Sequence, residues 1–306
     1  MSGVSECPVL APTGLAEYDA FHNCLLFVFG TLGNGCVLWC VRQCPKTPLP
    51  LKLMLASIYL PVAIICFFST LPLVVFVIAK YKLCWEINSV IWHSTNISVM
   101  VYSAMAQVEI FSITAMATFR VFAVWSSTKF ELTMDQLKWI LPSLWLSSIL
   151  ESQIVIGIDV YEVVDIPMLL SVIYYLPTVM LPLLYTLACY IAVFIKMRQH
   201  QQELNSMAAS ITSSVSAQAS RLVLMVFISN FMFGLPHAVF HVIPNPSIEV
   251  SFIVHIIYSI HFIVDPVVFF VFSENYRKVL WGQLKCLSIS GTKCSSTENS
   301  TKESNI

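Results

Sequence analysis

The segment Leu53–Ala79 reads LMLASIYLPVAIICFFSTLPLVVFVIA and contains no charged side chain. The hydrocarbon core of a lipid bilayer is about 30 Å thick, so a helix needs about 20 predominantly apolar residues to cross it. The segment meets this length requirement and therefore predicts a transmembrane helix.

Six further apolar stretches of similar length occur along the chain of 306 residues. The composition agrees with a membrane protein, because 57% of the residues are apolar and only 11% are charged, whereas soluble domains carry about 25% charged residues. The mean hydropathy of +0.78 points the same way. The predicted fold class is an all-α integral membrane protein with a seven-helix transmembrane bundle. The other six spans are predicted at Phe21–Val41, Ile91–Val124, Trp139–Ile158, Ile166–Ile195, Leu222–Ile243 and Val250–Phe272.

Basic residues indicate the orientation, because Lys and Arg accumulate on the cytoplasmic side of membrane proteins. With the N-terminus outside, only Lys80 and Lys82 of the 16 basic residues fall in external segments, and the remaining 14 are cytoplasmic. One span more or fewer would place alternate loops on the wrong side and destroy this asymmetry. The first 20 residues contain no Lys or Arg and lack the basic start of a secretory signal, which favours a retained first span.

Four regions follow from this topology. Residues 1–20 are predicted to form a short extracellular N-terminus, and residues 21–272 the transmembrane domain. Residues 273–287 are predicted to form a short amphipathic helix at the membrane surface. Residues 288–306 are rich in Ser, Thr and Lys and are predicted to be a disordered cytoplasmic tail.

The predicted amphipathic helix places Tyr276, Val279, Leu280 and Leu284 on one face, with basic residues beside them. Cys286 lies at its end and either carries a palmitoyl chain or stays a free thiol. The helix is therefore expected to lie against membrane lipid.

Charge and cysteine content exclude several classes of function. The net charge is −1, so no polyanion-binding surface is indicated and nucleic acid is not the predicted partner. The ten Cys residues show no paired CxxC spacing, which argues against a zinc ribbon or a disulfide scaffold. No cofactor is predicted.

Ionisable residues inside the membrane are costly, which makes them candidates for function. At 100° per residue, Tyr102, Glu109 and Arg120 fall on one stripe of the third span, to within about 20° of whole turns. This stripe is expected to face the bundle interior. Glu109 is then either a protonated residue bonded to a neighbouring helix or part of an ion-linked or proton-linked switch.

Prolines interrupt five of the predicted spans. Each proline removes a backbone hydrogen bond and kinks its helix, which opens a bundle on one side and provides hinges. They are Pro61, Pro72, Pro142, Pro177, Pro182, Pro236 and Pro266.

Short motifs occur in a fixed order along the spans. Taken with seven spans, an external N-terminus and a short amphipathic helix after the last span, they resemble the rhodopsin-like (class A) family of G-protein-coupled receptors. The resemblance covers about residues 20–286. The motifs are Gly33-Asn34, Thr118-Phe119-Arg120-Val121, Trp145, Pro182 followed by Tyr190, Phe233-Gly234-Leu235-Pro236, and Asp265-Pro266-Val267-Val268-Phe269.

The resemblance implies roles for several of these residues. Arg120 would meet the C-terminal helix of a heterotrimeric G-protein α subunit, and Tyr190 would swing inward to support it. Pro182, Pro236 and Pro266 would be the hinges of activation, which let the inner half of the sixth span move outward. A ligand that binds the open state more tightly would shift a two-state equilibrium.

The chain also departs from the family pattern. Phe119 replaces the acid that normally pairs with the arginine, so elevated signalling without ligand is expected. Gly234 replaces the aromatic side chain of the sixth span, and the second span lacks the family's sodium-site aspartate. Asn34, Glu109 and Asp265 are the residues of this chain expected to form an interior polar or ion site; odorant receptors also have a glutamate at the place of Glu109.

The family's disulfide between the third span and the second external loop is absent, because Thr95 replaces its cysteine and that loop contains none. In the oxidising exterior, Cys7 and Cys84 either form a disulfide bond or remain two free thiols.

In the family, the ligand lies in the outer half of the bundle, between the third, fifth, sixth and seventh spans. An amine ligand is not expected, because Tyr102 replaces the aspartate of amine receptors, and the seventh span has no lysine for retinal. A small neutral or weakly acidic organic ligand is predicted. The histidines among these residues either hold a metal ion or line the pocket uncoordinated; the uncoordinated arrangement is the prediction. The expected ligand-binding residues are Tyr102, Ser103, Gln107, Tyr174, Tyr175, Thr178, His237, His241, His255, Tyr258 and Ser259.

The predicted function is that of a non-enzymatic cell-surface receptor of chemosensory, odorant type, which spans the plasma membrane and activates a heterotrimeric G protein. The short N-terminal segment without a glycosylation sequon and the altered motifs are common among odorant-type receptors. Two alternatives remain: a receptor-like protein that does not couple, and a seven-span metal-dependent hydrolase using His237, His241, His255 and Glu151. A transporter is disfavoured because the spans show no inverted repeat.

Overall fold

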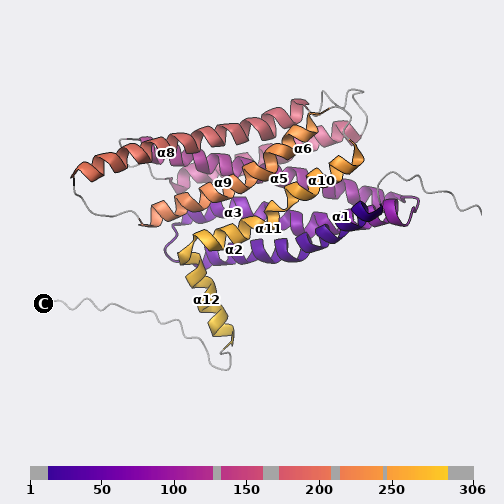
Figure 1. Ribbon diagram of the computed structural model, residues 1–306, viewed down its shortest axis with the longest axis horizontal. Coiled ribbons are helices and arrows are strands. Elements are labelled where there is room, and N and C mark those ends of the chain that lie inside the picture. Colours follow the sequence, from indigo (N-terminus) through magenta and orange to yellow (C-terminus); the bar gives the residue numbers. More distant parts are fainter. Residues whose placement is uncertain (1–12, 127–131, 161–171, 208–213, 244–246, 289–306) are drawn as a thin grey trace, which may run out of the picture.

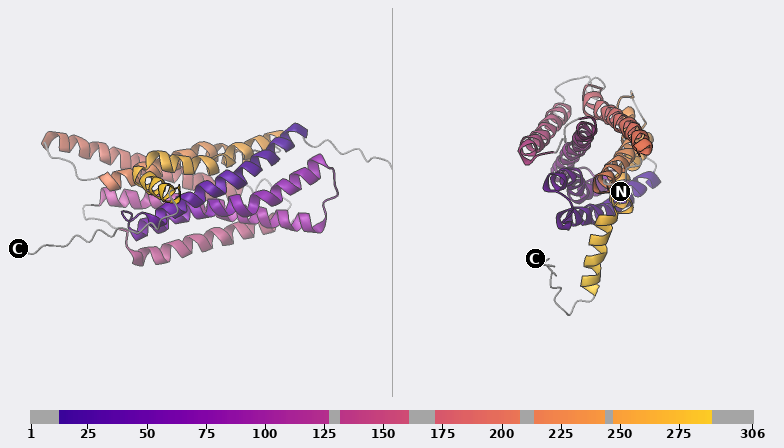
Figure 2. Two further views of the ribbon diagram at one scale, coloured as in Figure 1. Left: turned by 90° about the horizontal axis from the view of Figure 1, so that it is seen from below. Right: turned by 90° about the vertical axis from the view of Figure 1, so that its left-hand side faces the viewer.

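The structure is a computed structural model that describes residues 13–126, 132–160, 172–207, 214–243 and 247–288. The described residues form helices and contain no strand. The long helices run side by side along the longest axis of the molecule (Figure 1), and an end view shows them gathered in one bundle (Figure 2). The helices are α1 (Thr13–Leu25), α2 (Thr31–Gln43), α3 (Leu49–Ile64), α4 (Thr70–Val77), α5 (Ser89–Trp125), α6 (Met134–Val160), α8 (Leu181–Met207), α9 (Ser214–His241), α10 (Ile248–Ser259), α11 (His261–Phe272) and α12 (Glu274–Ser288).

Within the described residues, six helical segments are long and apolar enough to cross a membrane. They match six of the seven predicted spans, and α6 coincides with the predicted fourth span. Helix α6 is not among these six segments, but it packs along α3 and α5 inside the bundle. The all-helical membrane bundle predicted from the sequence is confirmed. The six segments are Gly14–Gln43, Leu49–Lys82, Ser89–Trp125, Val172–Gln199, Leu224–His241 and Ile248–Phe272.

The first helix begins at Thr13, eight residues before the predicted start of the first span at Phe21. Asp19 lies on the buried side of this extension and His22 just after it, and His22 Nε2 is 2.8 Å from the Ser259 hydroxyl. A polar contact with the seventh span therefore accompanies a helix that begins within residues 1–20, the predicted short N-terminal segment.

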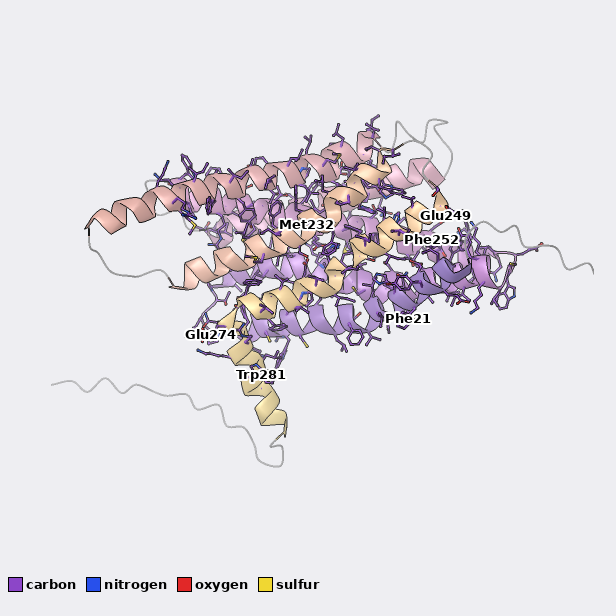
Figure 3. All side chains as sticks on the ribbon, viewed as in Figure 1. Phe21, Met232, Glu249, Phe252, Glu274 and Trp281 are labelled. Atoms are coloured by element: carbon purple, nitrogen blue, oxygen red, sulfur yellow. The ribbon has the colours of Figure 1, made fainter. Side chains whose placement is uncertain are left out.

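Apolar side chains cover the outside of the bundle, while polar side chains occur inside it. Phe21 and Met232 project from the helices in Figure 3 and are about 60% exposed, whereas Asn34 and Ser112 are fully buried. Lipid tails solvate apolar groups, so a membrane protein gains nothing by removing them from its surface, and interior hydrogen bonds help to hold the helices together.

Four wider helical turns of π type interrupt the spans, at Leu26–Gly30, Ile65–Ser69, Ile78–Lys82 and Leu176–Met180. Prolines explain two of them. Pro61 precedes the second of these turns by four residues, and Pro177 lies within the last; a proline cannot donate a backbone hydrogen bond, so the helix rearranges around it. At Pro61 and Pro177 the predicted interruption of the helix is therefore a wider turn.

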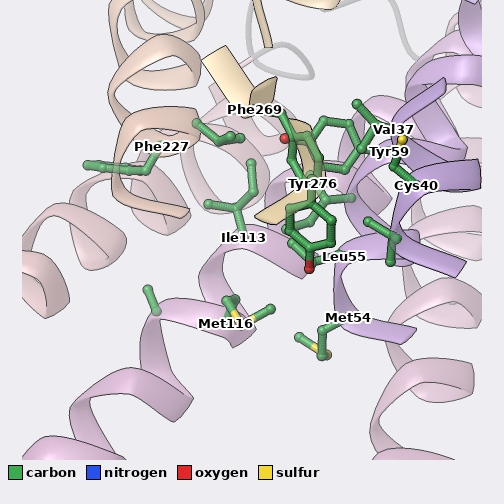
Figure 4. Packing of buried hydrophobic residues seen from close by; sticks show 14 of the residues in the cluster. Val37, Cys40, Met54, Leu55, Tyr59, Ile113, Met116, Phe227, Phe269 and Tyr276 are labelled. Carbon is green, nitrogen blue, oxygen red and sulfur yellow. The ribbon is translucent and has the colours of Figure 1, made fainter. Parts of the chain in front are cut away.

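Aromatic rings fill the half of the core nearest α12 (Figure 4). The ring of Phe269 in α11 lies edge-on to Tyr59 in α3, with centroids 5.3 Å apart, and 4.6 Å from the ring of Tyr276 in α12. Tyr190 in α8 stacks on Phe227 in α9 at 5.1 Å. The first two pairs connect the second and seventh spans to α12, and the third connects the fifth span to the sixth.

A hydrogen-bonded chain fixes α6 against its neighbours. Trp145 Nε1 donates to the Ser57 hydroxyl at 2.8 Å, and the hydroxyls of Ser57 and Ser112 lie 2.7 Å apart. Trp145 comes from α6, Ser57 from α3 and Ser112 from α5, so three helices meet at these polar groups.

Helix α12 leaves the bundle at a steep angle (Figure 1) and agrees to within one residue with the predicted amphipathic helix. Its Tyr276 hydroxyl lies 2.8 Å from Thr47 Oγ1, in the segment between α2 and α3. Burial raises the pKa of Tyr276 to about 12, although the hydrogen bond to Thr47 opposes this shift. Lys278 lies 2.6 Å from Glu274 and lowers the pKa of that carboxyl. The side chains of Leu284 and Cys286, and residues 289–306, lie outside the described part of the chain.

Candidate functional site

Four polar side chains from three spans converge at the centre of the bundle. Asn230 of α9 donates its side-chain amide to Asp265 Oδ2 at 2.9 Å and to Glu109 Oε1 at 3.4 Å. His261 Nε2 lies 3.6 Å from Glu109 Oε2. Its Nδ1 faces the backbone carbonyl of Tyr258. All four side chains are 3% exposed or less. We call Glu109, Asn230, His261 and Asp265 the central cluster.

The central cluster has fewer hydrogen bonds than its polar atoms require. Among the described residues, Glu109 Oε2, His261 Nε2 and Asp265 Oδ1 have no hydrogen-bond partner. Two buried carboxylates that share one amide group cannot both stay charged unless a proton or a cation compensates them. Glu109 and Asp265 therefore lie close together as expected, and their role as a proton or cation site stays a prediction.

Two members of the central cluster were not assigned to it from the sequence. His261 stands four residues before Asp265, and this spacing puts both side chains on one face of a helix. Asn230 stands six residues before Pro236 in the sixth span. The spacing of His261 and Asp265 could have revealed His261 from the sequence. Asn230 is placed in the central cluster only by the packing of α9 against α11.

Asn34, the third residue of the predicted ion site, makes different contacts. Its side-chain amide donates to the backbone oxygens of Gly30 at 2.8 Å and Phe262 at 2.9 Å. Phe262 lies four residues before Pro266, and a proline has no N–H to donate to that carbonyl. Asn34 thus supplies, from the first span, the hydrogen bond that Pro266 cannot make in the seventh.

Asn34→Leu is expected to lower the free energy of unfolding by about 1–3 kcal/mol, because it leaves the buried Phe262 carbonyl without a donor. Asn23→Leu is the matched control in the same span, since Asn23 hydrogen-bonds with Asp19, four residues back in its own helix, and not with another span. Unfolding of both variants in detergent micelles of rising SDS content measures the difference. Equal losses would contradict the role assigned to Asn34.

The half of the bundle away from α12 holds residues that are expected to bind a ligand, and a hydrogen-bond network centred on Gln107 joins several of them. Gln107 Oε1 accepts from the hydroxyls of Ser152 at 2.8 Å and Tyr174 at 3.1 Å. Its Nε2 donates to Glu151 at 3.0 Å. The Tyr174 hydroxyl lies 2.8 Å from that of Ser103. The third, fourth and fifth spans therefore meet at one polar group of side chains.

Aromatic rings and imidazoles form the other side of this region. The ring of Tyr175 stacks on His241, and that of Tyr258 stacks on His237, each with centroids 4.1 Å apart. Tyr102 lies edge-on to Tyr258 at 6.5 Å. Thr178 is buried and donates to the backbone oxygen of Tyr174, and Ser259 contacts His22, a residue the sequence did not single out.

At the opposite end, Arg120 is partly buried near the end of α5 and Tyr190 lies in α8. The two are close enough to interact electrostatically, and the Tyr190 hydroxyl has no hydrogen-bond partner among the described residues. Within the same residues no carboxylate forms a salt bridge with Arg120, and Phe119 occupies the place of the family's acid. Pro236 and Pro266 lie inside α9 and α11, and Pro182 is the second residue of α8.

Cys84 takes part in a disulfide bond and has a left-handed backbone, with φ of 51°. Cys7 lies outside the described residues, so the pairing of Cys7 with Cys84 stays a prediction.

No protein-family model and no curated protein matches the chain. The crystal structure of squid rhodopsin superimposes on it with a TM-score of 0.74, covering 92% of this chain and 89% of that one, at 11% sequence identity. The chain has the rhodopsin-like fold. In this fold α5 is the third span, and the central cluster joins it to the sixth and seventh. The rhodopsin-like architecture inferred from the sequence motifs is confirmed.

Proposed function

We propose that the protein is a G-protein-coupled receptor of the plasma membrane, with its N-terminus outside. The observation that carries this proposal is the rhodopsin-like fold, with Arg120 near the inner end of the third span and no salt bridge to it among the described residues. An arginine without an ionic partner is available to a G-protein α subunit, so the receptor is expected to signal without ligand.

The central cluster would couple ligand binding to G-protein activation. It links the third, sixth and seventh spans beside Pro236 and Pro266, the two proposed hinges. A cation or proton held there favours the arrangement in which Glu109, Asn230 and Asp265 are together. A ligand that binds better when they separate shifts the equilibrium toward the active state.

The ligand proposed is a small neutral or weakly acidic organic molecule, as for a chemosensory receptor of odorant type. Support comes from the outer region, where Tyr and His rings surround the polar groups of Gln107, Ser103 and Ser152. Aromatic rings accommodate apolar ligand surface, and hydroxyl, amide and imidazole groups orient a few polar atoms. A hydrolase receives less support, because Glu151 accepts a hydrogen bond from Gln107 and is not part of the histidine group.

The test is ligand-free dissociation of each class of heterotrimeric G protein in cells, at matched surface expression. Wild type is expected to give a signal that Arg120→Ala abolishes, because the arginine contacts the G protein. Arg42→Ala is the matched control: Arg42 is exposed in the last turn of α2 and should leave the signal unchanged. Silence of the wild type with every G protein would favour the receptor-like protein that does not couple.

Phe119→Asp is expected to lower ligand-free signalling several-fold while Phe119→Leu leaves it nearly unchanged. The new carboxylate adjoins Arg120 and can pair with it, and a partly buried ion pair favours the state in which it forms. The same G-protein dissociation assay measures both variants. If Phe119→Asp signals at the wild-type level, the absence of an acid beside Arg120 is not the cause of signalling without ligand.

A further inference from the structure

Three histidines meet where α9 ends and α10 begins, at the outer end of the bundle. His237 and His241 are one turn apart in α9, and His255 projects from α10, which packs beside α9 (Figure 1). One nitrogen from each imidazole lies within 4.8 Å of the others. The Nε2 atoms of His237 and His241 are 3.1 Å apart.

The backbone fixes which nitrogen of His255 faces the group. Its Nδ1 lies 2.7 Å from the carbonyl oxygen of Ser251, one turn earlier in α10. A carbonyl oxygen only accepts, so Nδ1 carries the proton and Nε2 keeps its lone pair. Metal-binding histidines are commonly oriented by this kind of hydrogen bond on the second nitrogen.

Stacking holds the other two rings. Tyr258 lies parallel to His237, with an interplanar angle of 14°, and Tyr175 lies parallel to His241, at 4°. Each imidazole therefore rests against a tyrosine from a different span, since Tyr258 belongs to α10 and Tyr175 to the segment before α8. Such support restricts ring rotation, which lowers the cost of ordering three ligands around one ion.

We propose that His237, His241 and His255 form a binding site for a divalent transition-metal ion of the zinc class. Two nitrogens bound to a tetrahedral zinc at about 2.0–2.1 Å lie about 3.4 Å apart, close to the separation found between His237 and His241. Three imidazoles without a carboxylate suit Zn²⁺ or Cu²⁺ and not Ca²⁺ or Mg²⁺, which prefer oxygen ligands. On binding, whichever of His237 and His241 carries its proton on Nε2 moves it to Nδ1, so both imidazoles stay neutral.

The site joins the outer ends of the sixth and seventh spans and leaves a fourth coordination position open. The inference goes beyond the proposed receptor function and does not rest on it, because metal binding is measured without any G protein. If the protein activates no G protein but binds the metal, the receptor proposal is wrong and the metal-site proposal stands.

The test uses the purified full-length protein in lipid nanodiscs, stripped with a chelator and titrated with Zn²⁺ by calorimetry. One Zn²⁺ per chain is expected to bind. His255→Phe keeps a ring at the site but removes its ligand nitrogen, and should weaken binding by at least about 100-fold, the upper loss seen for supporting residues of metal sites. His93→Phe, at an exposed histidine of α5, is the matched control and should bind as wild type does.

A second measurement needs no substitution. Cu²⁺ bound to the wild-type protein should show nitrogen hyperfine splitting from imidazoles in its electron paramagnetic resonance spectrum. The proposal is overturned if the wild type binds no Zn²⁺, if His255→Phe binds it as tightly as His93→Phe does, or if the copper spectrum shows oxygen ligands alone.

Discussion

Asn230→Leu is expected to lower the free energy of unfolding by about 3–5 kcal/mol, the loss typical of removing one partner from a buried charged group. The Asn230 amide is the donor to both Glu109 and Asp265, at 3.4 and 2.9 Å. Leucine matches the amide in size but donates nothing, so Glu109 and Asp265 would each lose a hydrogen bond in the bundle interior.

Unfolding in mixed micelles, followed by the reaction of buried Cys40 and Cys44 with a thiol-specific dye, measures this loss. The control is the double variant Asn230→Leu/Asp265→Leu. The double variant removes the Asp265 carboxyl together with its donor Asn230. It should lower the free energy of unfolding by less than the sum of the two single substitutions, because replacing both partners by apolar groups can be nearly neutral. Losses that add to within about 0.5 kcal/mol would show that the two side chains do not act together.

Gly30→Val is expected to lower the free energy of unfolding by about 1–3 kcal/mol, the typical cost of overpacking an interior. Gly30 lies where the first span crosses the second, and a Cβ atom at this position would stand 2.5 Å from Cys66 Sγ and 3.3 Å from Cys66 Cβ. The larger valine side chain forces these helices apart at a point where both contain a wider turn.

Gly35→Val is the matched control for this substitution, since nothing lies within 4 Å of a Cβ at Gly35 and the residue is exposed on the same helix. It should unfold close to wild type. Adding Cys66→Ala to Gly30→Val removes the nearest atom and should recover part of the loss. If the two valine variants unfold alike, valine lowers stability through its helix propensity and not through the contact with Cys66.

The number and character of the spans were readable from the chain because membrane crossing depends on local properties. Leu53–Ala79 is apolar over the thickness of a bilayer wherever its neighbours lie, and this segment forms most of the second span. The amphipathic helix was predicted for the same reason, since its face is defined by spacing within one helix. Glu109 was placed inside the bundle from periodicity alone, and the uninterrupted α5 preserves that periodicity over its whole length.

The partners of these side chains were decided only by the tertiary structure. Each wider turn holds about one extra residue, which rotates the helix beyond it by about 100° and changes which residues face inward. Such a turn at Leu26–Gly30 precedes Asn34, whose side-chain amide donates to the carbonyl freed by Pro266. The sequence alone determined the spans, their apolar lengths and the buried carboxyl group of the third span, because these are properties of one helix. The convergence of Asn230 and His261 on Glu109 and Asp265 depends on how separate helices rotate and cross, and only packing sets that.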